Sequence, residues 1–293
     1  MKTQENFLKE KLGLSENDKL ELKKFNRITR NTNYILDVNG ISMYFLKVNS
    51  EGRKKESEMF DFLKKYPLIN TIMPLYKDEK LIVFPYIPGL KDCQVRDNLD
   101  FIVDFHNKSL KLPDNAYNHF NEDRLFKNYS IIKFLDRVNR HRSLVLNFWK
   151  DVDSLETFYN KYPNEDFNSL PKILVHGDIQ HKNLQKDESG KIFLIDFEDV
   201  CYDSPSWDLS RALMDLEKNE IDEFKGKYVY SVDINNKKLL SLEIERNFVI
   251  RVITDAIGRQ QRFGVENGRM FLEIYREKYG EKLEEIIYDK NLF

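Results

Sequence analysis

The chain of 293 residues is poor in cysteine, with only Cys93 and Cys201. Two cysteines cannot form a zinc site by themselves, and they do not suggest a disulfide framework. A charge excess is also missing, because 47 basic residues stand against 49 acidic ones for a net charge of -2. Without a basic excess the chain has no general attraction for nucleic acid or for an anionic membrane surface. Nucleic-acid binding is therefore disfavoured.

The sequence also lacks an apolar run long enough to cross a bilayer. Residues 1–11 are polar and charged, unlike a secretory signal peptide. We therefore expect a cytoplasmic protein that makes no membrane contact. The hydrophobic fraction of 41% is sufficient for a packed core, and no internal repeat or Gly/Ser-rich linker divides the chain.

The N-terminal part of the sequence has the pattern of short strands around one helix. Asn39-Gly40 separates two strand-like runs at 34–38 and 41–48, and this dipeptide is a strong signal for a two-residue hairpin turn. Residues 53–66 predict a helix, because apolar residues recur at helical spacing and Pro67 follows.

A second pattern begins after a predicted strand at 80–86. Pro85, Pro88 and Gly89 interrupt it and indicate a hinge. Helical periodicity then predominates, with candidate helices at 98–109, 121–140, 142–160, 206–218 and from 241 onward, and a strand-rich block at 172–197. The order predicts an α+β protein with two lobes. Residues 1–86 form a small, β-rich N-terminal lobe and residues 87–293 a larger, mainly helical C-terminal lobe.

The strand-rich block carries the residues with the clearest chemical meaning. An apolar strand at 173–175 runs into a loop that holds Asp178, and Asn183 follows five residues later. A further strand at 191–195 ends at Asp196, after a turn at 187–190. This hairpin predicts that Asn183 and Asp196 lie close together, with Asp178 on the preceding loop.

These side chains are the ones that phosphoryl transfer requires. A hard cation that bridges nucleotide phosphates prefers oxygen ligands such as carboxylates and amides. A further carboxylate must orient the attacking hydroxyl and accept its proton.

The pattern His-x-Asp-x-x-x-x-Asn, followed by Ile-Asp-Phe-Glu, closely resembles that of the aminoglycoside phosphotransferase and choline kinase superfamily, whose fold is similar to that of protein kinases. The resemblance implies a bilobal, protein-kinase-like fold with Asp178 as the catalytic base. It implies that Asn183 and Asp196 hold Mg²⁺. It also implies that His176 organises the loop and that Asp208 supports it.

The resemblance extends over residues 20–215. It implies that Lys47 contacts the nucleotide phosphates and that Glu56 positions this lysine. The helical pattern agrees independently, since Glu56 lies on the apolar face of its helix and a buried carboxylate needs a partner. Further nucleotide contacts are implied for the residues before and in the hinge and for the loop ahead of the first strand: Thr32, Asn33, Phe84 and Tyr86.

Two departures from the kinase pattern matter. Residues 27–33 contain no glycine, although the nucleotide loop of the family often does. Gln180 stands two residues after Asp178, where protein kinases usually have lysine. Since no activation-segment signature follows Asp196 either, a protein substrate is disfavoured.

The sequence thus predicts an ATP- or GTP-dependent, Mg²⁺-dependent kinase acting on a hydroxyl of a small molecule. An aminoglycoside-type antibiotic is the first choice of acceptor. The alternatives are choline, ethanolamine or a sugar alcohol, and a catalytically silent nucleotide-binding module. Five acidic residues and no basic one lie from Asp196 to Asp208. They suit either attraction of a cationic acceptor or a solvated acidic surface, and both interpretations stay open, as does the oligomeric state.

Overall fold

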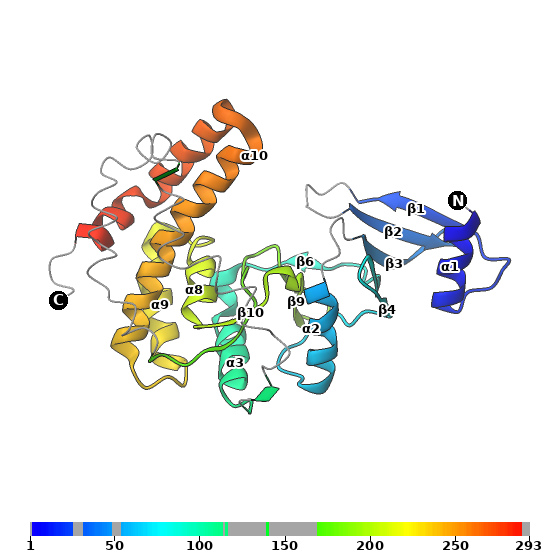
Figure 1. Ribbon diagram of the computed structural model, residues 1–293, viewed down its shortest axis with the longest axis horizontal. Helices are drawn as coiled ribbons and strands as arrows, with labels where there is room; N and C mark the ends of the chain where they lie inside the picture. Colours follow the sequence, from blue (N-terminus) through cyan, green and yellow to red (C-terminus); the bar gives the residue numbers. More distant parts are fainter. Residues whose placement is uncertain are drawn as a thin grey trace. The chain divides into compact units, whose positions relative to one another are not determined.

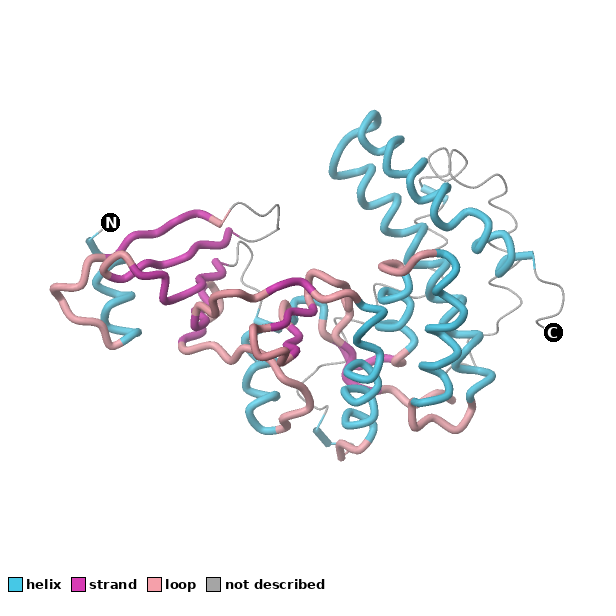
Figure 2. Tube along the Cα trace, turned by 180° about the vertical axis from the view of Figure 1, so that it is seen from behind, coloured by secondary structure: helices cyan, strands magenta, loops and turns pink. Residues whose placement is uncertain are grey.

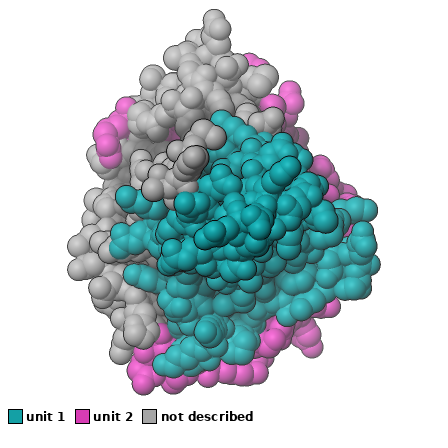
Figure 3. Space-filling view, turned by 90° about the vertical axis from the view of Figure 1, so that its right-hand side faces the viewer, with its two compact units in different colours: residues 1–93, 181–200 teal, residues 94–180, 201–293 magenta. Residues whose placement is uncertain are grey.

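The computed structural model describes residues 2–25, 32–48, 54–113, 115–116, 139–140 and 169–288. Figures 1 and 2 show its helices and strands. The chain divides into two compact units, coloured in Figure 3: residues 1–93 with 181–200, and residues 94–180 with 201–293. The α+β fold class is confirmed. The division into lobes at residues 86 and 87 stays a prediction.

The first unit is built on a five-stranded antiparallel sheet in the order β1-β2-β3-β5-β4. Its strands are β1 (Leu20–Lys24), β2 (Thr32–Val38), β3 (Ile41–Val48), β4 (Tyr76–Lys77) and β5 (Leu81–Pro85). The predicted hairpin is confirmed, since Asn39 and Gly40 join β2 to β3 with φ angles of 53° and 82°. Both turn positions need positive φ, which asparagine and glycine adopt most readily.

The two faces of this sheet are covered differently. Helix α1 (Lys2–Leu12), which the sequence did not reveal, buries Leu8 against Leu36, Tyr44 and Leu46 and lies beside the sheet in Figure 1. Helix α2 (Lys54–Lys65) packs against the opposite face, where the rings of Phe60 in α2 and Phe84 in β5 have centroids 5.5 Å apart. Strand side chains alternate between faces, so Lys47 points away from the α1 side.

A small three-stranded sheet completes the first unit. Its order is β6-β8-β9, formed by β6 (Lys91–Asp92), β8 (Leu184–Lys186) and β9 (Ile192–Leu194). A short 3-10 helix, η4 (Phe197–Asp199), follows β9. The turn between β8 and β9 closes on Asp187, whose Oδ1 accepts hydrogen bonds from the amides of Ser189 and Lys191.

The strand pairing around the loop that holds Asp178 differs from a simple hairpin with the strand at 173–175. That strand, β7 (Ile173–Val175), pairs with β10 (Cys201–Asp203), whereas β9 pairs with β8. The physical reason is the length of the connecting segments. The short turn at 187–190 joins only the two strands that flank it, β8 and β9. The longer segment between β7 and β8 does not force these two strands to pair, and β7 pairs with β10 instead.

The second unit is mainly helical. Besides β7 and β10 it contains η1 (Val95–Asn98), α3 (Leu99–Leu110), α8 (Ser206–Leu213), η5 (Lys218–Glu220), α9 (Ile221–Ser231) and α10 (Lys237–Tyr288). The helix predicted at 98–109 is confirmed as α3. The helix predicted at 206–218 ends earlier, at Leu213, and α9 was missed. The helices predicted at 121–140 and 142–160 lie outside the described residues, apart from the helical residues 139–140.

Helix α10 is not straight. Phe248 and Tyr279 have ring centroids 5.7 Å apart, although 31 residues of straight helix would span about 46 Å. The chain therefore turns back between them, and Figure 1 shows the two arms. Over the described part of the chain, no helix has the length and apolarity needed to span a membrane.

Candidate active site

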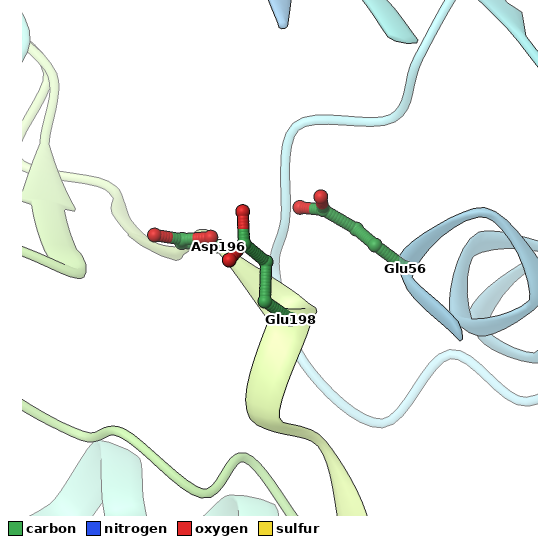
Figure 4. Close-up of side chains that lie close together, drawn as sticks. All are labelled: Glu56, Asp196 and Glu198. Atoms are coloured by element: carbon green, nitrogen blue, oxygen red, sulfur yellow. The ribbon is translucent and has the colours of Figure 1, made fainter. Parts of the chain in front are cut away.

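Lys47 is the centre of a charged cluster in the first unit. Its side chain is 8% exposed, and its Nζ lies 2.7 Å from one carboxylate oxygen of each of three residues: Glu56, Asp196 and Glu198. Glu56 comes from α2, Asp196 follows β9, and Glu198 belongs to η4. Figure 4 shows the three acidic side chains together. The structure therefore brings Lys47 together with its predicted partner Glu56 and also with Asp196, which was expected as a metal ligand.

The electrostatics of the cluster follow from burial and from the number of acids. Glu56 is 1% exposed, and this burial raises its pKa to about 7, although Lys47 opposes the shift. Burial alone would lower the pKa of Lys47, but the three carboxylates outweigh it and the pKa of Lys47 is raised. Lys47 therefore stays protonated among the three carboxylates.

Asp196 and Asn183 lie at the same end of the β8–β9 hairpin, as predicted. The amide of Ile195 donates a hydrogen bond to the Asn183 carbonyl at 3.0 Å, one step beyond the paired residues Leu184 and Leu194. Asn183 is buried, and Asp196 adopts a left-handed conformation with φ 67° and ψ 67°. This conformation costs a non-glycine residue about 1–2 kcal/mol, so the surrounding hairpin has to hold it.

The acidic residues of this cluster suit a divalent cation. One carboxylate oxygen from each of Glu56, Asp196 and Glu198 lies within 4.8 Å of the others. Carboxylates and an amide are the ligands that Mg²⁺ prefers, so Asp196 and Asn183 fit the role expected of them. Glu198 is an addition to the predicted set. Its signal was present in the sequence, as the glutamate two residues after the expected metal ligand.

The predicted nucleotide contacts are distributed over the same unit. Thr32 and Asn33 open β2 and pair with Val48 and Lys47 of β3. The Phe84 ring packs edge-on against Phe60. The backbone amide of Tyr86 donates to the Met43 carbonyl at 2.8 Å, which continues the sheet past the end of β5. The glycine-free segment ahead of Thr32 lies outside the described residues.

A second cluster surrounds Asp178 in the second unit. Arg211 Nε donates to Asp178 Oδ1 at 2.8 Å, and Gln180 Nε2 donates to Asp178 Oδ2 at 2.5 Å. Arg211 also donates to Gln180 Oε1 at 2.7 Å. Burial opposes the charge of Arg211, but Asp178 and Asp215 outweigh it, so the pKa of Arg211 is raised. Sequence reasoning missed Arg211, although Asp208 and Arg211 are three residues apart and share one face of α8.

Asp208 supports the loop that precedes Asp178. It is fully buried in α8, and its carboxylate accepts hydrogen bonds from the amides of His176 at 2.7 Å and Gly177 at 2.6 Å. His106 Nε2 lies 3.1 Å from the same carboxylate. Burial would raise the pKa of Asp208, but these hydrogen bonds, led by that of His106, outweigh it and lower the pKa. Asp208 is therefore an ionised anchor for the loop.

Two further residues brace this region. His106 Nδ1 lies 2.6 Å from the Tyr228 hydroxyl, so both nitrogens of this buried ring have partners. Arg251 donates to the Gly177 carbonyl at 2.7 Å, and its guanidinium carbon lies 3.5 Å from the centroid of the Trp207 ring. Trp207 is 5% exposed, so in this structure its ring meets Arg251 as part of the core.

Comparisons with known proteins agree with these features. A model described as the phosphotransferase enzyme family matches residues 21–231. The solved structure of the ADP-bound aminoglycoside phosphotransferase APH(2'')-Ib is 17% identical over 95% of this chain and 98% of its own, with a TM-score of 0.61.

Two solved kinases of small alcohols are similar as well. The choline kinase LicA from Streptococcus pneumoniae is 13% identical, with coverage of 95% and 99% and a TM-score of 0.55. A Plasmodium vivax ethanolamine kinase is 18% identical, with coverage of 88% and 84% and a TM-score of 0.58. At such identities these likenesses establish the fold. No curated protein sequence matches the chain.

Proposed function

This chain belongs to the phosphotransferase enzyme family and is a small-molecule kinase, and from that premise we propose that it transfers the γ-phosphate of ATP or GTP to a hydroxyl group of an aminoglycoside-type antibiotic. The observation that carries the proposal is the contact of Lys47 with Glu56, Asp196 and Glu198. A buried lysine held by a helix carboxylate, beside acids suited to a metal ion, is the arrangement that phosphate binding requires.

In the proposed reaction Asp178 accepts the proton of the acceptor hydroxyl. The hydroxyl oxygen forms a bond to the γ-phosphorus, the bond from that phosphorus to the bridging oxygen breaks, and the nucleoside diphosphate leaves. Lys47 steadies the phosphates, and Glu56 orients Lys47. Asn183 and Asp196 would hold Mg²⁺, which when bound neutralises negative charge on the phosphates.

The nucleotide base is proposed to lie beside the residues at the end of β5. Phe84 contributes an aromatic surface, and the backbone near Tyr86 offers polar groups to the edge of the base. Thr32 and Asn33 are proposed to lie near the phosphates, since β2 places Asn33 directly across from Lys47. Both ATP and GTP therefore belong in the assay.

The acceptor is proposed from the family and from the solved relatives. Two of these are aminoglycoside phosphotransferase structures, one with gentamicin and one with ADP. The second candidate is an amino alcohol, because choline and ethanolamine kinases share the fold. A silent nucleotide-binding module would not need Lys47, Asp178, Asn183 and Asp196 together, and the chain has all four.

The test is Mg²⁺-dependent consumption of ATP and of GTP with aminoglycosides, choline, ethanolamine and small sugars as acceptors. Asp178→Ala should lower turnover roughly 10²–10⁴-fold, about 3–5 kcal/mol, as expected for loss of a general base. Asp196→Ala should lower it further, since metal and nucleotide would both lose their position. Undiminished turnover in a folded Asp196→Ala protein would contradict the metal assignment. Tight nucleotide binding without turnover on any acceptor would favour the silent module.

A further inference from the structure

The side chains of Asp178, Gln180 and Arg211 form a closed ring of hydrogen bonds. Arg211 Nε donates to Asp178 Oδ1 at 2.8 Å, and Arg211 Nη2 donates to Gln180 Oε1 at 2.7 Å. Gln180 Nε2 closes the ring at Asp178 Oδ2, 2.5 Å away. The ring thus engages both carboxylate oxygens of Asp178 with different donors.

Two donors on the two oxygens fix the plane of the carboxylate. With one donor, the terminal torsion of an aspartate is broad and the carboxylate can rotate. The ring also fixes the amide of Gln180, because the Arg211 guanidinium offers only donors and so requires the amide oxygen. Without Arg211 the amide could turn and present its oxygen to the carboxylate of Asp178. Arg211 therefore acts on Asp178 both directly and through Gln180.

The helix that carries Arg211 makes the ring rigid. Arg211 lies on α8, three residues after Asp208, and its side chain is 13% exposed. Asp208 holds the backbone amides of His176 and Gly177, just ahead of Asp178. One helix therefore holds the backbone of the loop through Asp208 and the side chain at its tip through Arg211.

We propose that Arg211, with Gln180, is a positioning residue that orients the Asp178 carboxylate toward the acceptor hydroxyl. The inference rests on the proposed role of Asp178 as proton acceptor. Arg211 acts through Asp178 and not on the transferred phosphate, because its Nε and Nη2 donate to Asp178 and Gln180 and its Nη1 lies 3.9 Å from Asp215 Oδ1.

The experiment measures kcat and the KM for nucleotide in Arg211→Met, Arg211→Lys and Gln180→Leu, with the best acceptor from the panel. Misplacement of a reacting group by about 1 Å costs on the order of 100-fold, so Arg211→Met should lower kcat roughly 10–100-fold. The KM for nucleotide should stay within about 2-fold, because neither residue is assigned to nucleotide binding. Arg211→Lys should recover part of kcat, since it restores one donor to Asp178.

The matched control is Arg96→Met. Arg96 also pairs with a carboxylate, Glu220 at 3.0 Å, but its side chain is 54% exposed and lies outside the cluster. It should keep wild-type kcat. If Arg211→Met does not fold, the Gln180→Leu and Arg211→Lys variants test the same ring with smaller changes.

A double variant separates positioning from direct action. If Arg211 works through Asp178, then Arg211→Met causes no further loss in an Asp178→Ala background. Multiplied losses in Asp178→Ala/Arg211→Met would overturn the inference, as would wild-type kcat in Arg211→Met. Failure of the proposed function is a separate result, in which Asp178→Ala itself retains wild-type turnover.

Discussion

Removing a single oxygen from Tyr228 should destabilise the protein measurably. Tyr228 lies on α9, and its hydroxyl is 2.6 Å from His106 Nδ1. Both side chains are fully buried, and the other ring nitrogen of His106 faces the buried Asp208 carboxylate at 3.1 Å. Tyr228→Phe keeps the ring and its packing while it removes the hydroxyl that faces His106 Nδ1.

The magnitude follows from the partner that is left behind. Burial is the main cause that raises the pKa of Tyr228 well above its ordinary value, so the hydroxyl stays protonated and can donate. Because His106 is fully buried, its Nδ1 needs a hydrogen-bonding group opposite it, and the Tyr228 hydroxyl is that group. Phenylalanine supplies none. An unsatisfied buried nitrogen costs about 1–3 kcal/mol.

Urea denaturation of wild type and variant provides the assay. The control is Tyr230→Phe, two residues along the same helix, where the side chain is 87% exposed. This surface change should alter the free energy of unfolding by less than about 0.5 kcal/mol. A Tyr228→Phe protein as stable as Tyr230→Phe would refute the reasoning, since it would mean that the Tyr228 hydroxyl contributes nothing to the His106–Asp208 cluster.

Three further changes probe other parts of the structure. Lys47→Met should lower the free energy of unfolding by about 3–5 kcal/mol, because it leaves the Glu56 carboxylate buried without its cation. Urea denaturation measures this loss, and adding Glu56→Gln should restore part of it. Burial raises the pKa of Asp203 to about 6, above its ordinary 3.8, so between these pH values the folded protein holds a proton on Asp203 that the unfolded chain has released. The free energy of unfolding should therefore fall by about 3 kcal/mol as pH rises from 3.8 through 6. Asp203→Asn should therefore be more stable than wild type at pH 8 but not at pH 4, and equal pH slopes in denaturation would contradict this. Gly177→Ala should cost about 1–2 kcal/mol in thermal denaturation, since Gly177 has φ 84°.

Local patterns predicted those elements whose cause is local. The hairpin at Asn39-Gly40 depends on two residues that tolerate positive φ, and the helix at α2 depends on apolar spacing followed by Pro67. The same spacing placed Glu56 on a buried face, and the structure confirms that it is 1% exposed and meets Lys47. Such features need no knowledge of distant segments.

Other features depended on contacts between distant segments and could not be predicted in the same way. The strand at 173–175 has an apolar pattern that suits many partners, and its partner, β10, begins about 25 residues later. Arg211 shares a helix face with Asp208, which spacing alone shows, but spacing does not show that this face meets Asp178. The helix predicted to 218 ends at Leu213, because the downstream residues form η5 and α9 instead.

The two buried carboxylates show why burial alone does not decide a site's chemistry. Glu56 and Asp208 are each at most 1% exposed, yet the pKa of Glu56 is raised to about 7 and that of Asp208 is lowered. Glu56 shares the cation of Lys47 with Asp196 and Glu198, whose negative charges add to the effect of burial. Asp208 accepts hydrogen bonds from two backbone amides and from His106. The supply of donors around each carboxylate therefore makes Asp208 a fixed anion and leaves the charge of Glu56 dependent on its neighbours.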